Sequence, residues 1–255
     1  MDTSTACHPV VDTPNLVSFW DFQEPAGQPR VSRGPCPYAL KEMAGPVARV
    51  ADGIFGPYAA FLDYRQWMSI ARADCPALNI NGPDAQVTVL AWIRRHRKPE
   101  IECEFVAGIW NETNSKRQYG LFLDLRIHQG ADQVGGHVSS LGGPTPGHKY
   151  CMDAAIGGAR VSYFGDWKCV GFTYDGESAR AYLNGTAHPR DTFNPYHYPG
   201  GLYDGGPNGA NFTVGAVDRG GSIGNWFTGH LGGLAIFDRA LSADEMVKLA
   251  SVVIS

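Results

Sequence analysis

Side chains that suit acid–base chemistry recur at alternate positions along residues 119–128. If that segment is a β-strand, Asp124, Arg126 and His128 share one face of it, because successive strand residues point to opposite faces. The next predicted strand, residues 136–141, places His137 and Ser139 together on one face. We expect the two strands to pair as a hairpin and to gather these side chains on one sheet surface. The same pattern is also typical of a plain solvated face.

This cluster has the residue types that a uronate polysaccharide lyase needs. Such an enzyme neutralises the sugar carboxylate, removes the proton beside it and protonates the leaving oxygen. Arg126 suits neutralisation, His128 or His137 suits proton abstraction, and Tyr150 suits protonation. The other polar residues of the cluster and of the loop that follows it are expected to contact the sugar: Asp124, Ser139, His148 and Lys149. The sequence contains no lyase signature motif that would identify the reaction.

A second candidate is an aromatic loop at residues 188–211. It is rich in Gly and Pro, exceeds hairpin length, and carries Tyr196, His197, Tyr198 and Tyr203. Loops this long in a compact domain are usually functional or disordered, and this many aromatics favour order. Tyrosine rings stack on sugar C–H surfaces, so the loop could form a glycan platform. The alternative is that the aromatics only pin the loop to the rest of the domain.

Net charge excludes several classes of partner. The chain has 21 basic and 25 acidic residues, a formal net charge of −4, which gives no electrostatic footprint for nucleic acid or anionic membrane. No apolar stretch approaches the ~18 residues that a membrane-spanning helix needs. We therefore expect no nucleic acid and no membrane, while the polar cluster and the aromatic loop favour a poly- or oligosaccharide partner, anionic glycans included. The oligomeric state stays open.

Hydrophobic alternation predicts the elements that position these residues. Short segments with a period of two, separated by turn signals, favour an all-β sandwich. The predicted strands are residues 16–22, 58–62, 67–71, 86–94, 105–110, 119–128, 136–141, 168–174, 179–184, 212–217 and 231–237. The 32 glycines among 255 residues agree with many turns and argue against a helical bundle.

One helix is expected, near the C-terminus. Ser242 and Glu245 form the sequence pattern of a capping box at its start. No interior linker separates two composition regimes, so residues 1–255 are interpreted as a single domain. Its core spans about residues 14–251, and residues 1–13 are an N-terminal extension.

Six cysteines are scattered through the chain without any C-x-x-C pair. Six allow 15 disulfide connectivities, and spacing alone does not choose among them. The even number favours disulfides and a secreted or periplasmic location. The N-terminal residues show no signal-peptide pattern.

Seven blocks resemble one known family, in family order. Residues 16–22 (LVSFWDF) resemble its first strand, commonly LVAYWPFDE, and residues 61–63 and 67–70 (FLD and WMSI) are similar to its FDG…YVTV hairpin. Residues 86–93 (QVTVLAWI) resemble FTVSAWVK, and residues 119–123 (YGLFL) resemble YGLYL. Residues 166–176 (DWKCVGFTYDG) resemble WHHVAGTYDG, and residues 181–185 (AYLNG) resemble LYVNG. Residues 229–242 (GHLGGLAIFDRALS) resemble GLIDEVRIYNRALS. The chain is thus similar to the laminin-G-like, concanavalin A-like jelly-roll family.

The resemblance implies two stacked antiparallel sheets, one of them concave, with ligands bound on that face or at a rim calcium. Of the acidic residues that hold calcium in the family, Asp21 is present, but Gly232 and Gly233 stand where other acids would be. Calcium prefers six or more oxygen ligands, so Asp21 is a weak candidate ligand and could simply cap a turn.

The family does not imply one function, because it contains lectins, glycan-binding modules, adhesion domains, glucanases and lyases. The first hypothesis is a secreted glycan-binding domain, and the alternative is a polysaccharide lyase. A glycoside hydrolase is a further alternative. Residues 100–105 (EIECEF) resemble the E-I-D-x-E-F strand of jelly-roll glucanases, in which Glu100 and Glu104 would act, although Glu102 replaces the central Asp.

Overall fold

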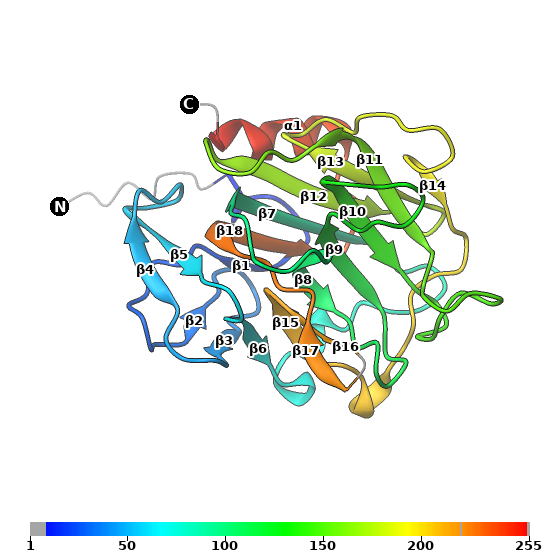
Figure 1. The fold of residues 1–255 in the computed structure, drawn as a ribbon, viewed down its shortest axis with the longest axis horizontal. Coiled ribbons are helices and arrows are strands. Elements are labelled where there is room, and N and C mark those ends of the chain that lie inside the picture. Colours follow the sequence, from blue (N-terminus) through cyan, green and yellow to red (C-terminus); the bar gives the residue numbers. More distant parts are fainter. Residues whose placement is uncertain (1–8, 220, 254–255) are drawn as a thin grey trace.

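Two antiparallel β-sheets are stacked face to face in the computed structural model, which describes residues 9–219 and 221–253 (Figure 1). The first sheet has the order β14 (Tyr196–His197), β13 (Ser178–Leu183), β12 (Lys168–Tyr174), β7 (Val87–Arg95), β18 (Gly229–Phe237), β5 (Tyr58–Leu62) and β4 (Ala48–Ala51), with β1 (Leu16–Trp20) also pairing with β18. The second has the order β11 (Ala154–Arg160), β10 (Gln133–Val138), β9 (Tyr119–Leu123), β8 (Glu104–Ile109), β15 (Phe212–Val214), β6 (Met68–Ile70), β3 (Ala39–Glu42) and β2 (Arg30–Val31). The all-β two-sheet prediction is confirmed.

A small ribbon and a few helices complete the described chain. The ribbon pairs β16 (Val217–Arg219) with β17 (Ser222–Gly224). The short 3₁₀ helices are η1 (Arg72–Asp74), η2 (Pro76–Leu78), η3 (Gly206–Asn208) and η4 (Ser251–Val253). The predicted C-terminal helix is α1 (Ala243–Ala250).

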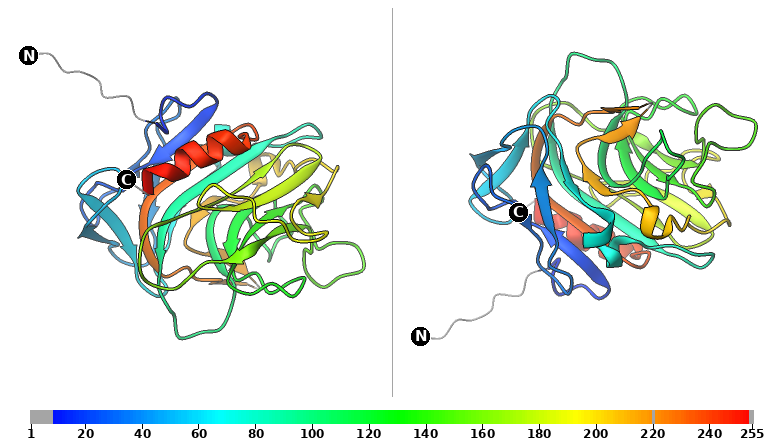
Figure 2. Two further views of the ribbon diagram at one scale, coloured as in Figure 1. Left: turned by 90° about the horizontal axis from the view of Figure 1, so that it is seen from above. Right: turned by 90° about the horizontal axis from the view of Figure 1, so that it is seen from below.

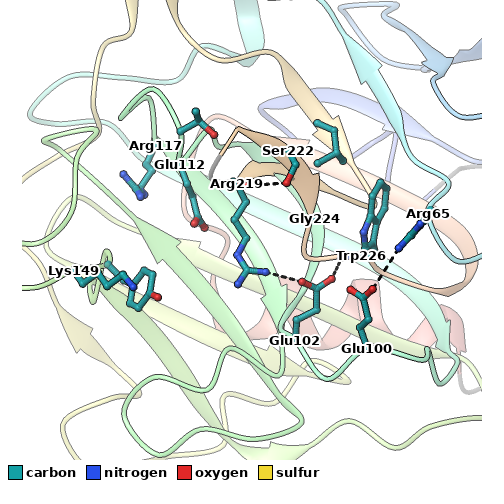
Figure 3. A pocket seen from close by; sticks show the side chains of 13 residues that line it. Arg65, Glu100, Glu102, Glu112, Arg117, Lys149, Arg219, Ser222, Gly224 and Trp226 are labelled. Atoms are coloured by element: carbon teal, nitrogen blue, oxygen red, sulfur yellow. Dashed lines mark hydrogen bonds and ion pairs between the residues drawn. The ribbon is translucent and has the colours of Figure 1, made fainter.

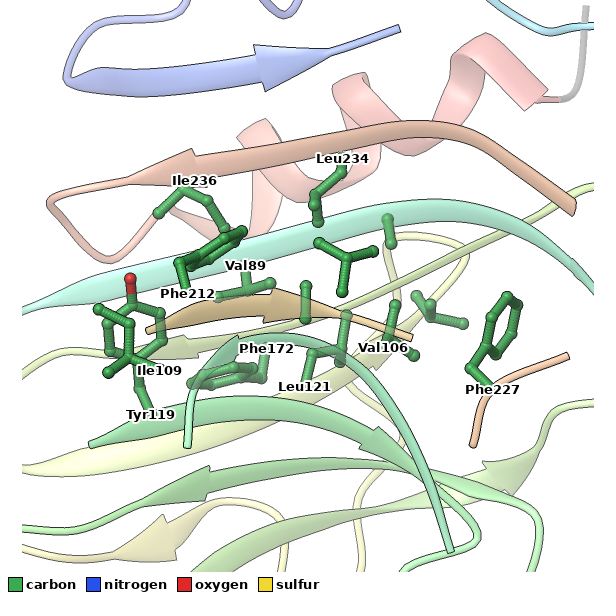
Figure 4. Packing of buried hydrophobic residues seen from close by; sticks show 14 of the residues in the cluster. Val89, Val106, Ile109, Tyr119, Leu121, Phe172, Phe212, Phe227, Leu234 and Ile236 are labelled. Atoms are coloured by element: carbon green, nitrogen blue, oxygen red, sulfur yellow. The ribbon is translucent and has the colours of Figure 1, made fainter. Parts of the chain in front are cut away.

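The main core lies between the two sheets. Strand β7 shows why: Val87, Val89 and Ala91 point into the core cluster, whereas Leu90 and Trp92 point to the other side of the sheet. This is the alternation that the sequence predicts for residues 86–94. Figure 4 shows the inward side chains of both sheets meeting in one apolar layer.

Helix α1 covers the outer face of the first sheet. Met246 and Leu249 pack with Leu90 and Trp92 of β7 in a second apolar cluster. In Figure 2 the helix, in red, runs along the outer side of β18 and β7. The outer face of the second sheet carries a third, smaller apolar cluster, which includes Phe105 of β8 and Phe122 of β9.

Two sequence predictions about elements are wrong. The strand predicted over residues 119–128 ends at Leu123, because Asp124, Arg126 and His128 have left-handed backbone angles (φ 51°, 57° and 50°) that a strand does not accommodate. The second error is an omission, because no strand is predicted between residues 141 and 168, where β11 lies. The predicted pairing of β9 with β10 is confirmed, with Leu123 opposite Val134 and Tyr119 opposite Val138.

Candidate functional site

Two adjoining cavities form a groove over the outer face of the second sheet, and we call them the larger and the smaller cavity. The larger has a volume of about 900 Å³ and the smaller about 330 Å³. They share five lining residues, Glu102, Glu112, Arg117, Tyr150 and Arg219, so they are continuous. The smaller cavity rests on the outer-face apolar cluster, since Trp110, Leu125 and Cys151 belong to both.

Ion pairs build one wall of the larger cavity. Arg219 holds Glu102 at 2.7 Å, and the backbone N–H of Trp226 donates to the same carboxylate at 3.1 Å. Arg65 lies 3.4 Å from Glu100 (Figure 3). These four charged groups neutralise each other in pairs, so they supply polarity and hydrogen-bonding capacity without a net charge.

The opposite wall carries positive charge without a partner carboxylate. Within the described chain, neither Arg117 nor Lys149 makes an ion pair. Arg117 is buried and donates to the carbonyl of Gly142 at 3.3 Å. The Lys149 ammonium lies 5.2 Å from the centre of the Tyr150 ring. Figure 3 places both cations away from Glu100 and Glu102. Glu112 also lines the cavity and makes no ion pair within the described chain, but accepts a hydrogen bond from the Trp110 indole at 3.3 Å. Two cations against this one carboxylate still favour an anionic group.

The smaller cavity is mostly apolar and contains His137. The imidazole packs against Trp110 and Phe122, with ring centres 4.7 and 5.1 Å away. Its Nδ1 lies 3.0 Å from the backbone carbonyl of Asp153. Burial lowers the pKa of His137 to about 3, so the ring is neutral at ordinary pH.

The structure brings three of the four predicted catalytic residues together. Arg126, His137 and Tyr150 line the smaller cavity, although Arg126 is reached through a loop and not through the predicted strand. The fourth, His128, does not line the groove. Its ring stacks on Phe193 at 4.3 Å, and Nε2 lies 2.7 Å from the carbonyl of Met152.

The predicted sugar contacts near this cluster are mostly tied into the fold. Asp124 is buried and accepts two hydrogen bonds from Arg126, at 2.8 and 3.0 Å. Ser139 is buried and accepts the N–H of Gly142 at 3.0 Å. His148 is exposed in the same loop as Lys149, but only Lys149 lines the groove.

The predicted aromatic platform is placed away from the groove. The Tyr196 hydroxyl donates to Asp153 at 3.0 Å, and the Tyr198 hydroxyl lies 2.8 Å from Ser140 Oγ, so both rings hold the loop onto the sandwich. The Tyr203 backbone N–H donates to the carbonyl of Ser139 at 2.7 Å. His197 is exposed on the edge strand β14. Neither cavity is lined by any of these four residues.

The geometry at Glu100 and Glu104 contradicts the glucanase-like pair. Strand β8 begins at Glu104, so the two carboxylates do not alternate along one strand. Glu104 is buried and accepts two hydrogen bonds from Arg95, at 2.8 and 2.9 Å. Burial raises the pKa of Glu104, and Arg95 opposes that shift. Glu104 also lines neither cavity, so it does not meet a sugar held in the groove.

The surroundings of Asp21 do not fit a calcium ion. Arg33 holds the carboxylate at 2.5 Å, and burial raises its pKa. A side chain at Gly232 or Gly233 would collide with Trp167 or Phe55, so ring atoms fill the places where family acids would stand. Among the described residues, no group of three or more His, Cys, Asp and Glu could hold a metal. Calcium thus remains a sequence prediction without a supporting donor set.

The predicted disulfides are not supported. Cys36, Cys75, Cys103, Cys151 and Cys169 are free, and Cys7 lies outside the described residues. Burial raises the pKa of Cys103 to about 12 and that of Cys151 to about 11, so both are thiols at ordinary pH. The described part of the chain also holds no helix with the length and apolar character to cross a membrane.

Sequence reasoning missed most of the groove. Glu112 and Arg117 lie in the loop between β8 and β9, whereas Arg219 lies at the end of β16, much later in the chain, and none of the three carries a motif. Glu102 was noticed only as a departure from the glucanase pattern. The pairing of β15 with β8 brings these segments together, and residue spacing does not contain that information.

Comparisons with known proteins agree with this fold. The chain matches the model of the concanavalin A-like lectin/glucanases superfamily over residues 71–246. No curated protein sequence matches it.

Several solved structures are similar to this chain. One is domain 4 of AbnA, an extracellular GH43 arabinanase from Geobacillus stearothermophilus, in complex with arabinotriose. It has 16% identity and a TM-score of 0.60, over 92% of this chain and 98% of that one. A Trypanosoma rangeli sialidase in complex with sialic acid has 14% identity and a TM-score of 0.56, over 94% of this chain but 33% of the sialidase. The botulinum neurotoxin serotype G binding domain has 11% identity and a TM-score of 0.57, over 93% of this chain and 51% of that one. At these identities the likeness shows the fold alone.

Proposed function

Because the chain belongs to the concanavalin A-like lectin/glucanase superfamily, we propose that it is a carbohydrate-binding domain that holds a poly- or oligosaccharide in the groove. The observation that carries the proposal is Tyr150. Its ring is half exposed at the junction of the two cavities, beside charged groups that can bind hydroxyls. An aromatic face flanked by hydrogen-bonding groups suits a sugar ring, which has C–H faces and a polar edge.

The electrostatics of the groove favour a glycan that carries acidic groups. Arg117 and Lys149 face the larger cavity without partner carboxylates, Glu112 lines it without an ion pair, and the other charged groups described there are paired, so two cations stand against one free carboxylate. A uronate or sulfate group would pair with them, and arginine would contribute a planar fork of donors. An extracytoplasmic location, where polysaccharides are met, is part of the same proposal.

Binding is favoured over lyase chemistry by the state of His137. A general base works best when its pKa lies near the operating pH, whereas burial lowers the pKa of His137 to about 3. Arg126, the other main candidate, already binds the Asp124 carboxylate through two nitrogens. We therefore expect neutral and acidic polysaccharides to bind without producing unsaturated uronate ends. Appearance of such ends in ultraviolet absorbance would restore the lyase hypothesis.

Substituting Tyr150→Ala tests the binding site. We expect about tenfold weaker binding of the best ligand from a glycan array, because the stacking surface is lost. The melting temperature should hardly change, because an exposed side chain contributes little to folding. Phe164→Ala is the matched control, since Phe164 is exposed to a similar degree (51% against 50%) and does not line the groove. Equal effects of the two substitutions, or no glycan bound by the unaltered protein, would contradict the proposal.

A further inference from the structure

The smaller cavity differs from the larger one in the chemistry of its walls. Trp110, Leu125, Ile127 and Cys151 form an apolar wall of this cavity, whose volume is about 330 Å³. The charged groups that also line it are Glu102, Glu112, Arg117, Arg126 and Arg219. Trp110 and Leu125 are themselves buried, so this wall is a fixed part of the outer-face cluster. A wholly hydroxylated sugar edge would lose hydrogen bonds to water against such a wall. The cavity therefore suits a sugar substituent that has an apolar end.

His137 supplies one fixed hydrogen-bond acceptor in this apolar setting. A backbone carbonyl can only accept, so the 3.0 Å contact with Asp153 puts the ring proton on Nδ1. Nε2 then keeps its lone pair, and no group of the described chain donates to it. The lowered pKa keeps the ring in this neutral form at ordinary pH. Nε2 is thus a fixed acceptor that can take an N–H or O–H from a ligand in the cavity.

Donors stand at the rim of the same cavity. Arg117 and Tyr150 line it as well as the larger cavity, and the Arg117 guanidinium has more N–H groups than its single bond to Gly142 uses. The small space thus offers an acceptor, donors and an apolar wall. An acetamide has the complementary set, namely one N–H, one carbonyl and one methyl group. A plain hydroxyl lacks the methyl, and a deoxy sugar methyl lacks the N–H.

We propose that the smaller cavity recognises the acetamido group of a 2-acetamido sugar, with its N–H donated to Nε2 of His137. The methyl group packs on Trp110 and Leu125, and the carbonyl accepts from Arg117. This inference rests on the proposed function and narrows its substrate class. With the cations of the larger cavity, it indicates a glycan in which an N-acetylated amino sugar adjoins an acidic residue.

Matched glycans test the inference directly. Chitotetraose and cellotetraose share one β-1,4 backbone and differ at carbon 2, which bears an acetamido group in the first and a hydroxyl in the second. Titration calorimetry with this pair, and an array that pairs other 2-acetamido glycans with their hydroxyl counterparts, should show at least about tenfold preference for the acetamido form. Equal binding within pairs would overturn the inference and leave the proposed function standing. Absence of all glycan binding would overturn both.

His137→Phe removes the acceptor and keeps the ring. The phenyl group can retain the contacts with Trp110 and Phe122, and the Asp153 carbonyl still accepts the Val138 N–H at 3.1 Å. We expect the ratio of the affinity for the acetamido form to that for the hydroxyl form to fall to about one, while the affinity for the hydroxyl form changes little. His96→Phe is the matched control, because His96 also packs among aromatic rings but lies outside the groove.

Ile127→Trp gives an independent readout by filling the cavity. Ile127 is only partly buried, so the larger side chain can occupy the cavity without repacking the core. We expect loss of the acetamido preference with an unchanged circular dichroism spectrum. Val247→Trp, on the exposed side of α1, controls for adding an exposed indole. Undiminished preference in both His137→Phe and Ile127→Trp would overturn the inference.

Discussion

Burial and pairing decide what each polar side chain of this protein can do. His137 and Glu104 are both of types that carry out catalysis, yet His137 is enclosed by aromatic rings and Glu104 is held by Arg95. Enclosure disfavours the charged form of either group. The half-exposed Tyr150, with no such constraint, is better placed to meet a ligand.

The burial of His137 predicts a pH dependence of stability. Its pKa is about 3 in the folded protein, whereas an unfolded histidine titrates near 6.5. Between these values the unfolded chain binds the extra proton, so the free energy of unfolding falls as the pH is lowered from about 6.5 towards 3. His137→Phe removes this pH-dependent contribution to the free energy of unfolding, which is at most about 1.4 kcal/mol per pH unit.

Urea denaturation of the wild type and of His137→Phe between pH 7 and pH 4 measures the effect. The wild type should lose stability more steeply than the variant. His230, whose pKa burial lowers to about 4, keeps a similar dependence in both proteins. Parallel stability curves would show that His137 is accessible to protons in the folded state.

At this scale the sequence predicted residue types well and their surroundings poorly. Arg126, His137 and Tyr150 were predicted to converge, and they line one cavity. The Arg95 partner of Glu104 was not foreseen, because their side chains meet through the packing of β7 and β8 at one end of the sandwich. Burial is a property of the assembled fold, so a local pattern does not reveal it.

Elements with a strong local pattern were predictable. Strand β7 and helix α1 were identified from alternation and from the capping pattern. Strands β2, β3 and β4 were not, because they are short, lie at or beside sheet edges and contain few large apolar residues. The loop after Leu123 continues the alternation of β9 in sequence, and only its left-handed backbone ends the strand.

The start of α1 yields a prediction at the scale of the element. Ser242 accepts the N–H of Glu245, and the Glu245 carboxylate accepts the N–H of Ser242 at 2.8 Å. Ser242→Ala should lower the free energy of unfolding by about 1 kcal/mol, because it leaves a helix N–H without its partner. Urea denaturation measures this, and Ser251→Ala at the other end of the helix is the control.

Acid should remove the Glu245 half of this cap. Hydrogen bonds from Arg239 lower the pKa of Glu245 to about 2, below its unfolded value. Its contribution is therefore complete above about pH 4.5 and disappears as the pH falls towards 2. The loss in free energy of unfolding caused by Ser242→Ala should therefore become smaller as the pH falls from about 4.5 towards 2. A cost that does not change with pH would indicate that the two halves of the box act independently.

At the scale of the molecule, one core joins segments from both ends of the chain. The cluster between the sheets runs from Val17 to Ile236. Strand β18 connects distant parts of the chain, because it pairs with β1, β5 and β7. It also contributes Leu231, Leu234 and Ile236 to that core. The family blocks predicted this overall arrangement, whereas the groove depends on how the less patterned segments cross the second sheet.

The position of β18 predicts that folding is all-or-none. A chain ending at residue 228 lacks the strand at the centre of the first sheet, so β7 and β5 each lose one of their two partners and α1 is absent. We expect this chain to show no cooperative urea transition, because the remaining strands present unpaired edges and an open core. A chain ending at residue 251 retains β18 and α1 and serves as the control, with a midpoint close to that of the full chain. Cooperative unfolding of the shorter chain would contradict this prediction. It would show that the part of the chain before β18, which carries the groove, folds without β18 and α1.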